Sequence, residues 1–69
     1  MNTIRISLNG NTRDVREGTT ILKLLKELEV EEFKIIVQVS GEIIASNKYH
    51  LKELKNGDIV ELINFVGGG

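Results

Sequence analysis

Apolar and polar side chains alternate over residues 4–8 of the chain. This period of two predicts a β-strand with one face on a hydrophobic core. Asn9-Gly10 follows directly, and this dipeptide is typical of a two-residue hairpin turn because both central positions need a positive φ. We therefore predict a hairpin, in which a polar second strand over residues 11–16 pairs antiparallel with the first.

A helical spacing of apolar residues begins after Gly18. Between residues 21 and 28, Ile and Leu recur at i, i+3, i+4 and i+7, with Lys and Glu on the rest of the circumference. Thr20 precedes this run and is a suitable N-cap. The pattern predicts one amphipathic helix that lies across a sheet and buries its apolar stripe there.

Shorter apolar runs follow the predicted helix. Residues 35–39 alternate as a strand does, and residues 43–45 form a short run suited to the edge of a sheet. In the irregular segment after them, we expect Tyr49 and Leu51 to anchor the loop to the core. A tight turn at residues 55–58 then leads to the last strand.

The last predicted strand covers residues 59–66 and carries apolar residues on both faces. Val60 and Leu62 share one face, whereas Ile59, Ile63 and Phe65 share the other. Because the helix can cover only one face of the sheet, the core beneath the helix does not account for the second group.

The order of these elements predicts the fold class. A hairpin, one helix and further short strands are typical of an α+β protein of the β-grasp (ubiquitin-like) type. We expect a mixed four- or five-stranded sheet with one helix packed on one face. The right-handed crossover rule places the strand after the helix parallel to a strand of the hairpin. The predicted domain spans residues 1–66, and residues 67–69 form a flexible glycine tail.

Composition narrows the possible partners. The chain has 69 residues, which leave room for one small domain. Nine Lys and Arg residues against ten Asp and Glu are mixed along the chain, so no basic block is available to bind nucleic acid. No apolar run approaches the roughly 20 residues that span a bilayer, and no signal-peptide core is present. We expect a cytoplasmic protein that binds neither nucleic acid nor membrane.

The supply of catalytic and metal-binding residues is small. The chain has no cysteine and one histidine, His50, which excludes disulfide scaffolds, thiolate zinc sites and cysteine nucleophiles. Nothing in the sequence places His50 beside a serine, and Gly18 stands alone before the helix rather than in a phosphate-binding loop. We therefore expect no metal site, and the protein is not expected to be an enzyme.

A glycine triplet, Gly67-Gly68-Gly69, follows the last predicted strand. Taken alone, the triplet is compatible with a slack end that has no function. Glycine has no Cβ, however, so such a segment can also pass through a narrow channel into an active site. At about 3.3–3.6 Å per extended residue, residues 66–69 would carry the last carbonyl roughly 13 Å from the folded body.

Several segments spread over the whole chain form a more specific combination. They are residues 4–10, 18–21 with 24–25, 37–44, 56–58 and 66–69. In these segments, and in having no cysteine, the chain resembles the ubiquitin-like sulfur carriers of the ThiS (thiamin biosynthesis) family. Ser40, Ala45 and Tyr49 depart from that pattern, in which Asn, Pro and Trp are expected.

The resemblance implies a chemistry for Gly69. A ubiquitin-activating-like (ThiF-like) adenylyltransferase would use ATP and Mg²⁺ to adenylate the carboxylate of Gly69, and a persulfide donor would then convert it to a thiocarboxylate. The carrier itself would bind no cofactor and would need no thiol. A ThiG-like thiazole synthase would receive the sulfur. Two alternatives stay open: the small subunit of molybdopterin synthase or another such carrier, and a β-grasp binding module whose glycines have no function.

An enzyme that receives the tail must also bind the folded body. Ile36, Ile63 and Phe65 are predicted to face away from the helix, and an exposed apolar patch is typical of a protein interface. Arg5, on the same predicted face of the first strand, would add a polar rim. The alternatives are that a loop covers these residues or that the predicted strand phase is wrong by one residue.

Overall fold

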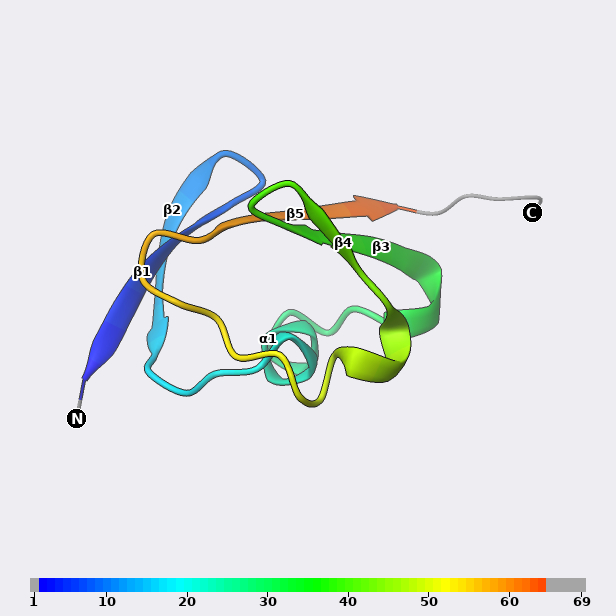
Figure 1. Ribbon diagram of the computed structural model, residues 1–69, viewed down its shortest axis with the longest axis horizontal. Helices are drawn as coiled ribbons and strands as arrows, with labels where there is room; N and C mark the ends of the chain where they lie inside the picture. Colours follow the sequence, from blue (N-terminus) through cyan, green and yellow to red (C-terminus); the bar gives the residue numbers. More distant parts are fainter. Residues whose placement is uncertain (1, 65–69) are drawn as a thin grey trace.

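The computed structural model describes residues 2–64, in which five strands form a single mixed sheet and one α-helix lies against one face of it (Figure 1). The elements are β1 (Thr3–Leu8), β2 (Asn11–Arg16), α1 (Ile21–Glu27), β3 (Ile35–Val39), β4 (Glu42–Ile44) and β5 (Ile59–Asn64). Two 3₁₀ turns are also present, Glu32–Lys34 between α1 and β3 and Ser46–Lys48 between β4 and β5. None of the helices in this part of the chain has the length and apolar character needed to span a membrane.

β1 and β2 form the predicted hairpin: β2 has the predicted bounds, and β1 begins one residue earlier than predicted, at Thr3. The two turn residues have positive φ, 49° at Asn9 and 86° at Gly10, as a two-residue turn of this kind requires. Leu8 lies opposite Asn11, and the pairing continues to Thr3 opposite Arg16. Asparagine tolerates this backbone region better than most residues, and glycine has no Cβ to hinder it.

The strand order is β2-β1-β5-β3-β4. β5 pairs parallel with β1 and antiparallel with β3, so the sheet is mixed, as predicted, and has five strands. The first strand after the helix, β3, runs in the same direction as β2, which agrees with the crossover rule. In the sheet, β1 and β5 lie between β2 and β3. The local hydrophobic pattern of the sequence does not indicate this separation.

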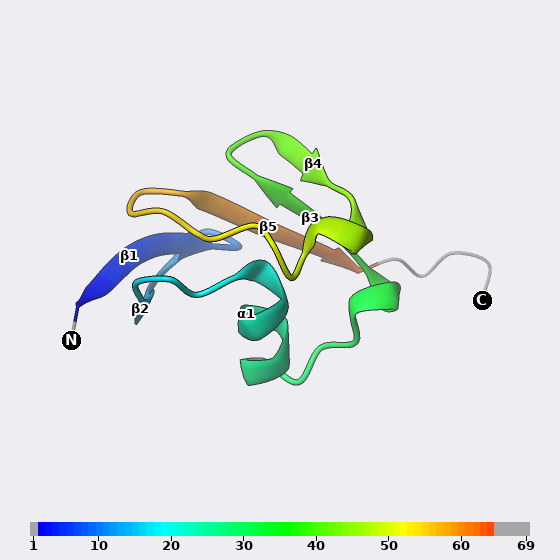
Figure 2. The same ribbon diagram turned by 60° about the horizontal axis from the view of Figure 1, so that its bottom comes forward.

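The helix begins and ends where the spacing predicts. The Thr20 side chain accepts a hydrogen bond from the backbone N–H of Lys23 at 3.2 Å and so caps the first turn. Figure 2 shows α1 below the sheet. The helix buries Ile21, Leu24 and Leu25 against the inner face of the sheet, where Ile6, Val37 and Val60 are also buried. The apolar stripe therefore belongs to the core.

The loop after β4 matches only half of the expectation. Tyr49 is 2% exposed and belongs to the core, as predicted, but Leu51 is 63% exposed, so its predicted anchoring role is wrong. The N–H of Leu51 donates to the C=O of Lys48, which makes this segment a helical turn. Residues two apart in such a turn point in nearly opposite directions, so one apolar residue of the pair had to face solvent.

Candidate functional site

β5 is the element that leads to the predicted tail. It lies in the middle of the sheet, and Asn64 is its last residue. The predicted site residues Phe65, Gly67, Gly68 and Gly69 lie outside the described residues, as does the predicted domain boundary at residue 66. The described part of the candidate site is therefore β5 itself, the residues that hold it and the sheet face beside it.

Polar groups of both hairpin turns contact the backbone of β5. At its start, the Ile59 N–H donates to the Ser40 Oγ at 3.2 Å, and the Ser40 N–H donates to the Ile59 C=O at 2.6 Å. Near its end, the Leu62 N–H donates to the Asn9 Oδ1 at 2.8 Å, and the Asn9 Nδ2 donates to the Leu62 C=O at 3.4 Å. Each turn therefore fixes one end of the strand.

Neither of these contacts was predicted from the sequence. The Asn-Gly pattern indicates a turn, and nothing in it indicates that the Asn9 side chain reaches a residue 53 positions later. The only available signal was the choice of asparagine at position 9, where glycine would satisfy the turn equally well. Ser40, one of the departures from the family pattern, sits in the second turn with a φ of 48°.

The sheet face opposite the helix carries an apolar patch. Ile36 and Ile63 lie directly opposite each other on β3 and β5. Ile43 of β4 lies opposite Gln38 and is therefore a diagonal neighbour of Ile36. Ile36 is half-buried, whereas Ile63 is 48% and Ile43 66% exposed. The predicted strand phase is therefore correct over residues 59–64. We call Ile36, Ile43 and Ile63 the outer-face patch.

The sequence missed Ile43 as a member of this patch. Ile43 and Ile44 are adjacent in a three-residue edge strand, so their side chains point to opposite faces. Ile44 enters the core and Ile43 faces outward. An apolar pair in such a short strand necessarily exposes one member, and this rule would have been sufficient to find it.

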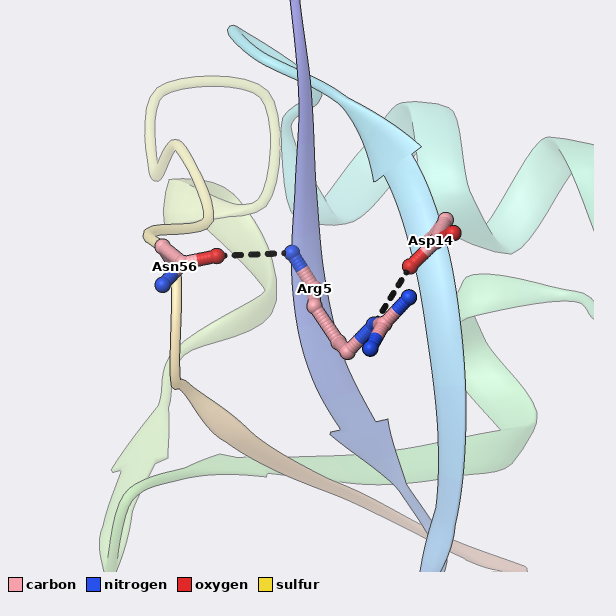
Figure 3. A network of polar contacts seen from close by, with 3 residues as sticks. All are labelled: Arg5, Asp14 and Asn56. Carbon is pink, nitrogen blue, oxygen red and sulfur yellow. Dashed lines mark hydrogen bonds and ion pairs between the residues drawn. The ribbon is translucent and has the colours of Figure 1, made fainter.

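Arg5 does not border the outer-face patch, which corrects the predicted polar rim. Ser7 of β1 lies opposite Ile59 of β5, so Arg5 and Ile63 are offset by six residues, or about 20 Å along the sheet. Both face outward, but at opposite ends. Figure 3 shows Arg5 between its two partners: its side chain reaches Asp14 on β2, and its backbone N–H donates to Asn56 Oδ1 at 2.9 Å.

At that end of the sheet face, Arg5 forms an ion pair with Asp14. The Arg5 Nε donates to the Asp14 Oδ1 at 2.9 Å. This hydrogen bond and the attraction of the two charges lower the pKa of Asp14 and raise the pKa of Arg5. Both groups are well exposed, so the pair contributes little to stability. The Arg5 guanidinium, which was predicted to help bind a partner, is therefore already paired with Asp14.

No three His, Asp or Glu side chains of residues 2–64 lie close enough together to hold a metal ion. His50 is exposed and directly follows the buried Tyr49. The chemically distinctive features of the described chain are thus the firmly held central strand and the outer-face patch next to its end.

Comparison with known proteins shows which family this chain resembles in sequence and in fold. The ThiS family profile matches residues 6–69. The sulfur carrier protein ThiS of Bacillus subtilis is 38% identical over 65 residues, which cover 93% of this chain and 98% of that protein. A crystal structure of the thiamine biosynthesis protein ThiS from Geobacter metallireducens superposes with a TM-score of 0.83 at 29% identity. That match covers 96% of this chain and all of the other.

A second kind of relative is much longer. A thiazole synthase of Paramagnetospirillum magneticum is 32% identical over 66 residues, or 96% of this chain. This chain spans only 20% of the length of that synthase, and the same share of a second one from Magnetococcus marinus. Segments similar to this chain therefore occur within proteins named as thiazole synthases.

Proposed function

The chain belongs to the ThiS family and is a sulfur carrier of thiamin biosynthesis, and we propose that it holds its sulfur on the α-carboxyl of Gly69. The observation that carries this proposal is that the family match extends through the glycine triplet to residue 69. The folded body then serves to present that carboxyl to enzymes, and the protein itself catalyses no reaction.

The chemistry of a carboxylate explains the need for activation. The α-carboxyl has a pKa of about 3.3–3.7, so near neutral pH it is an anion that resists nucleophiles. In the proposed sequence, an adenylyltransferase uses ATP with Mg²⁺ to form the acyl-adenylate and release pyrophosphate. The terminal sulfur of a persulfide then attacks the carbonyl carbon, and AMP leaves. A thiol cleaves the remaining S–S bond and frees the thiocarboxylate.

A thiazole synthase is the proposed acceptor of the sulfur. This assignment is supported by the thiazole synthases that contain a segment similar to this chain. A fused carrier would meet its synthase at a high effective concentration, and a separate carrier must find it by docking. These relatives favour thiazole formation over the molybdopterin alternative. The requirement for ATP favours the cytoplasm as the place of work.

The outer-face patch is the proposed docking surface for these enzymes. Ile63, near the end of β5, and Ile43, on β4 at the sheet edge, are exposed apolar side chains of the same face. Apolar side chains of this kind supply much of the energy of interfaces. Gln38 and Glu61 lie opposite each other beside them and take the place of Arg5 as the polar border.

Intact-mass spectrometry tests the proposal. The protein is incubated with a ThiF-like adenylyltransferase, ATP, Mg²⁺ and a persulfide donor. We expect the mass to rise by the difference between one sulfur and one oxygen, with the change confined to the C-terminal peptide. Omitting ATP is the control. A protein that never changes mass with an active adenylyltransferase, or a mass change elsewhere in the chain, would rule out the proposed site.

A further inference from the structure

We propose that Asn9 is a positioning residue for Gly69, because its side chain fixes the last described part of β5, the strand that leads to Gly69. The inference rests on the proposed function, since it assigns a role in presenting Gly69 to partner enzymes. It is carried by the two hydrogen bonds between the Asn9 carboxamide and the backbone of Leu62.

The hydrogen-bond pattern along β5 shows which groups its end requires. Asp58, just before β5, and the even-numbered residues of β5 turn their backbone groups toward β1. The C=O of Asp58 accepts from the Ser7 N–H, and the C=O of Val60 accepts from the Asn9 N–H, both at 2.9 Å. Continuing this parallel ladder would require a backbone C=O for the Leu62 N–H and a backbone N–H for the Leu62 C=O.

The backbone of β1 cannot supply those two groups. At Asn9 the chain enters the turn, with a φ of 49°, and leaves the sheet direction. The carboxamide of Asn9 has one acceptor and one donor on the same carbon, as a peptide group does. Its Oδ1 accepts from the Leu62 N–H and its Nδ2 donates to the Leu62 C=O. The side chain thereby extends the ladder by one step.

Packing gives this end of β5 less support than its middle. Val60 is fully buried, but Leu62 is only half-buried and Asn64 is exposed. On the helix side, a groove of about 410 Å³ opens along Leu8, Asn9, Leu62 and Asn64 instead of a filled core. The β3 side of the ladder and the Asn9 side chain therefore hold the strand end together.

The contact lies close to Gly69 along the chain, so its loss would affect how Gly69 is presented to an enzyme. Leu62 precedes Gly69 by seven residues. If residues from Leu62 onward detached from β1, more of the chain before Gly69 would have to be ordered each time the carboxyl enters an enzyme. Such an ordering cost acts on binding before any chemistry takes place. Loss of the contact should therefore raise KM and leave kcat nearly unchanged.

Three variants separate this role from that of the turn. Asn9→Gly keeps a residue that accepts positive φ and removes both hydrogen bonds. Asn9→Asp keeps the acceptor for the Leu62 N–H and removes the donor. The matched control is Asn56→Ala, which also removes a carboxamide contact to a strand backbone, but at the far end of the sheet, where Asn56 Oδ1 accepts from the Arg5 N–H of β1.

Two measurements are made on each variant: amide hydrogen exchange at Leu62, and the kinetics of adenylation by pyrophosphate exchange. For Asn9→Gly we expect exchange at Leu62 to be about tenfold faster, and KM to rise about three- to tenfold, the loss of one to two hydrogen bonds. Asn9→Asp should lie between wild type and Asn9→Gly. In Asn56→Ala, both quantities should stay within about twofold of wild type.

The outcomes separate the two proposals. If amide hydrogen exchange at Leu62 is unchanged in Asn9→Gly, the Asn9 side chain does not hold the end of β5, and the proposal is overturned. Faster exchange with the same KM as Asn56→Ala would overturn its positioning role. A wild-type protein that is never adenylated would overturn the proposed function. The hydrogen-exchange data would still show whether Asn9 holds the end of β5 in the free protein.

Discussion

Ile36 and Ile63 lie directly opposite each other on β3 and β5, on the sheet face that the helix does not cover. Two isoleucines at these positions add nothing to the main core and leave apolar surface in water. A protein of this size has a small free energy of unfolding, so such a placement calls for an explanation. The proposed docking of partner enzymes on this surface accounts for the placement and gives the first prediction.

Ile63→Asp should weaken the complex with the adenylyltransferase by about tenfold or more in Kd, because it puts a charge in a buried part of the proposed interface. Titration calorimetry measures the change. Ile59→Asp is the matched control, since Ile59 is 55% exposed on the same strand face but lies four residues from Ile63, beyond Glu61. Equal weakening by both variants would argue against a localised patch.

Changes at Gly69 should separate folding from function. Deleting Gly69, or adding one residue after it, should abolish sulfur loading because the reacting carboxyl is removed or displaced. The melting transition should stay the same, since the core lies within residues 6–60. Intact mass and thermal unfolding are measured on the same samples. Normal loading of the extended variant would contradict the tail mechanism.

Leu25→Ala should cost about 2–5 kcal/mol of the free energy of unfolding, because it leaves a cavity beneath the sheet. Leu25 is 1% exposed and belongs to the buried stripe of α1. Urea denaturation measures the loss. The neighbouring Lys26 is exposed, so Lys26→Ala should change stability by less than about 0.5 kcal/mol. Similar losses in both variants would place the helix in the wrong orientation.

Tyr49 should make the protein sensitive to alkaline pH. Burial of the phenol raises its pKa above the ordinary value of 10.0, because the folded state favours the neutral form. Its contribution is therefore fully present below pH 10.0 and is lost as pH rises through the folded-state pKa. Urea denaturation at increasing pH should show this loss.

The control for this prediction is Tyr49→Phe, which has no ionisable group at the same position. Its free energy of unfolding should fall less steeply above pH 10.0. The remaining slope in that variant belongs to lysines and other groups. Identical slopes in the two proteins would show that the Tyr49 hydroxyl ionises as freely in the folded state as in the unfolded one.

Local patterns were sufficient to predict the elements but not how they meet. Residues 4–16 fold as predicted because alternation and the Asn-Gly turn are short-range signals. The strand phase of β5 followed from alternation in the same way. The bounds of α1 followed from the apolar spacing together with the Thr20 cap.

The exposure of Leu51 and Ile43 was misjudged or missed within single local segments. The other errors concern contacts between distant segments. The position of Arg5 relative to Ile63 depends on the register of β1 against β5, which are paired across more than 50 residues of sequence. No local pattern determines that register. The contact from Asn9 to Leu62 depends on the same pairing, so the sequence indicated the turn and missed what its side chain does. The tail residues rest on the resemblance to a family, which no periodicity could supply.

The central place of β5 also has a mechanical consequence. An enzyme that grips the last residues of this protein applies its force along a strand that is bonded on one side to β1 and on the other to β3. Such a load shears two ladders at once, and cannot unzip them bond by bond as it would at a sheet edge. If Gly69 is presented to enzymes as proposed, this arrangement would protect the fold against being pulled apart from that end.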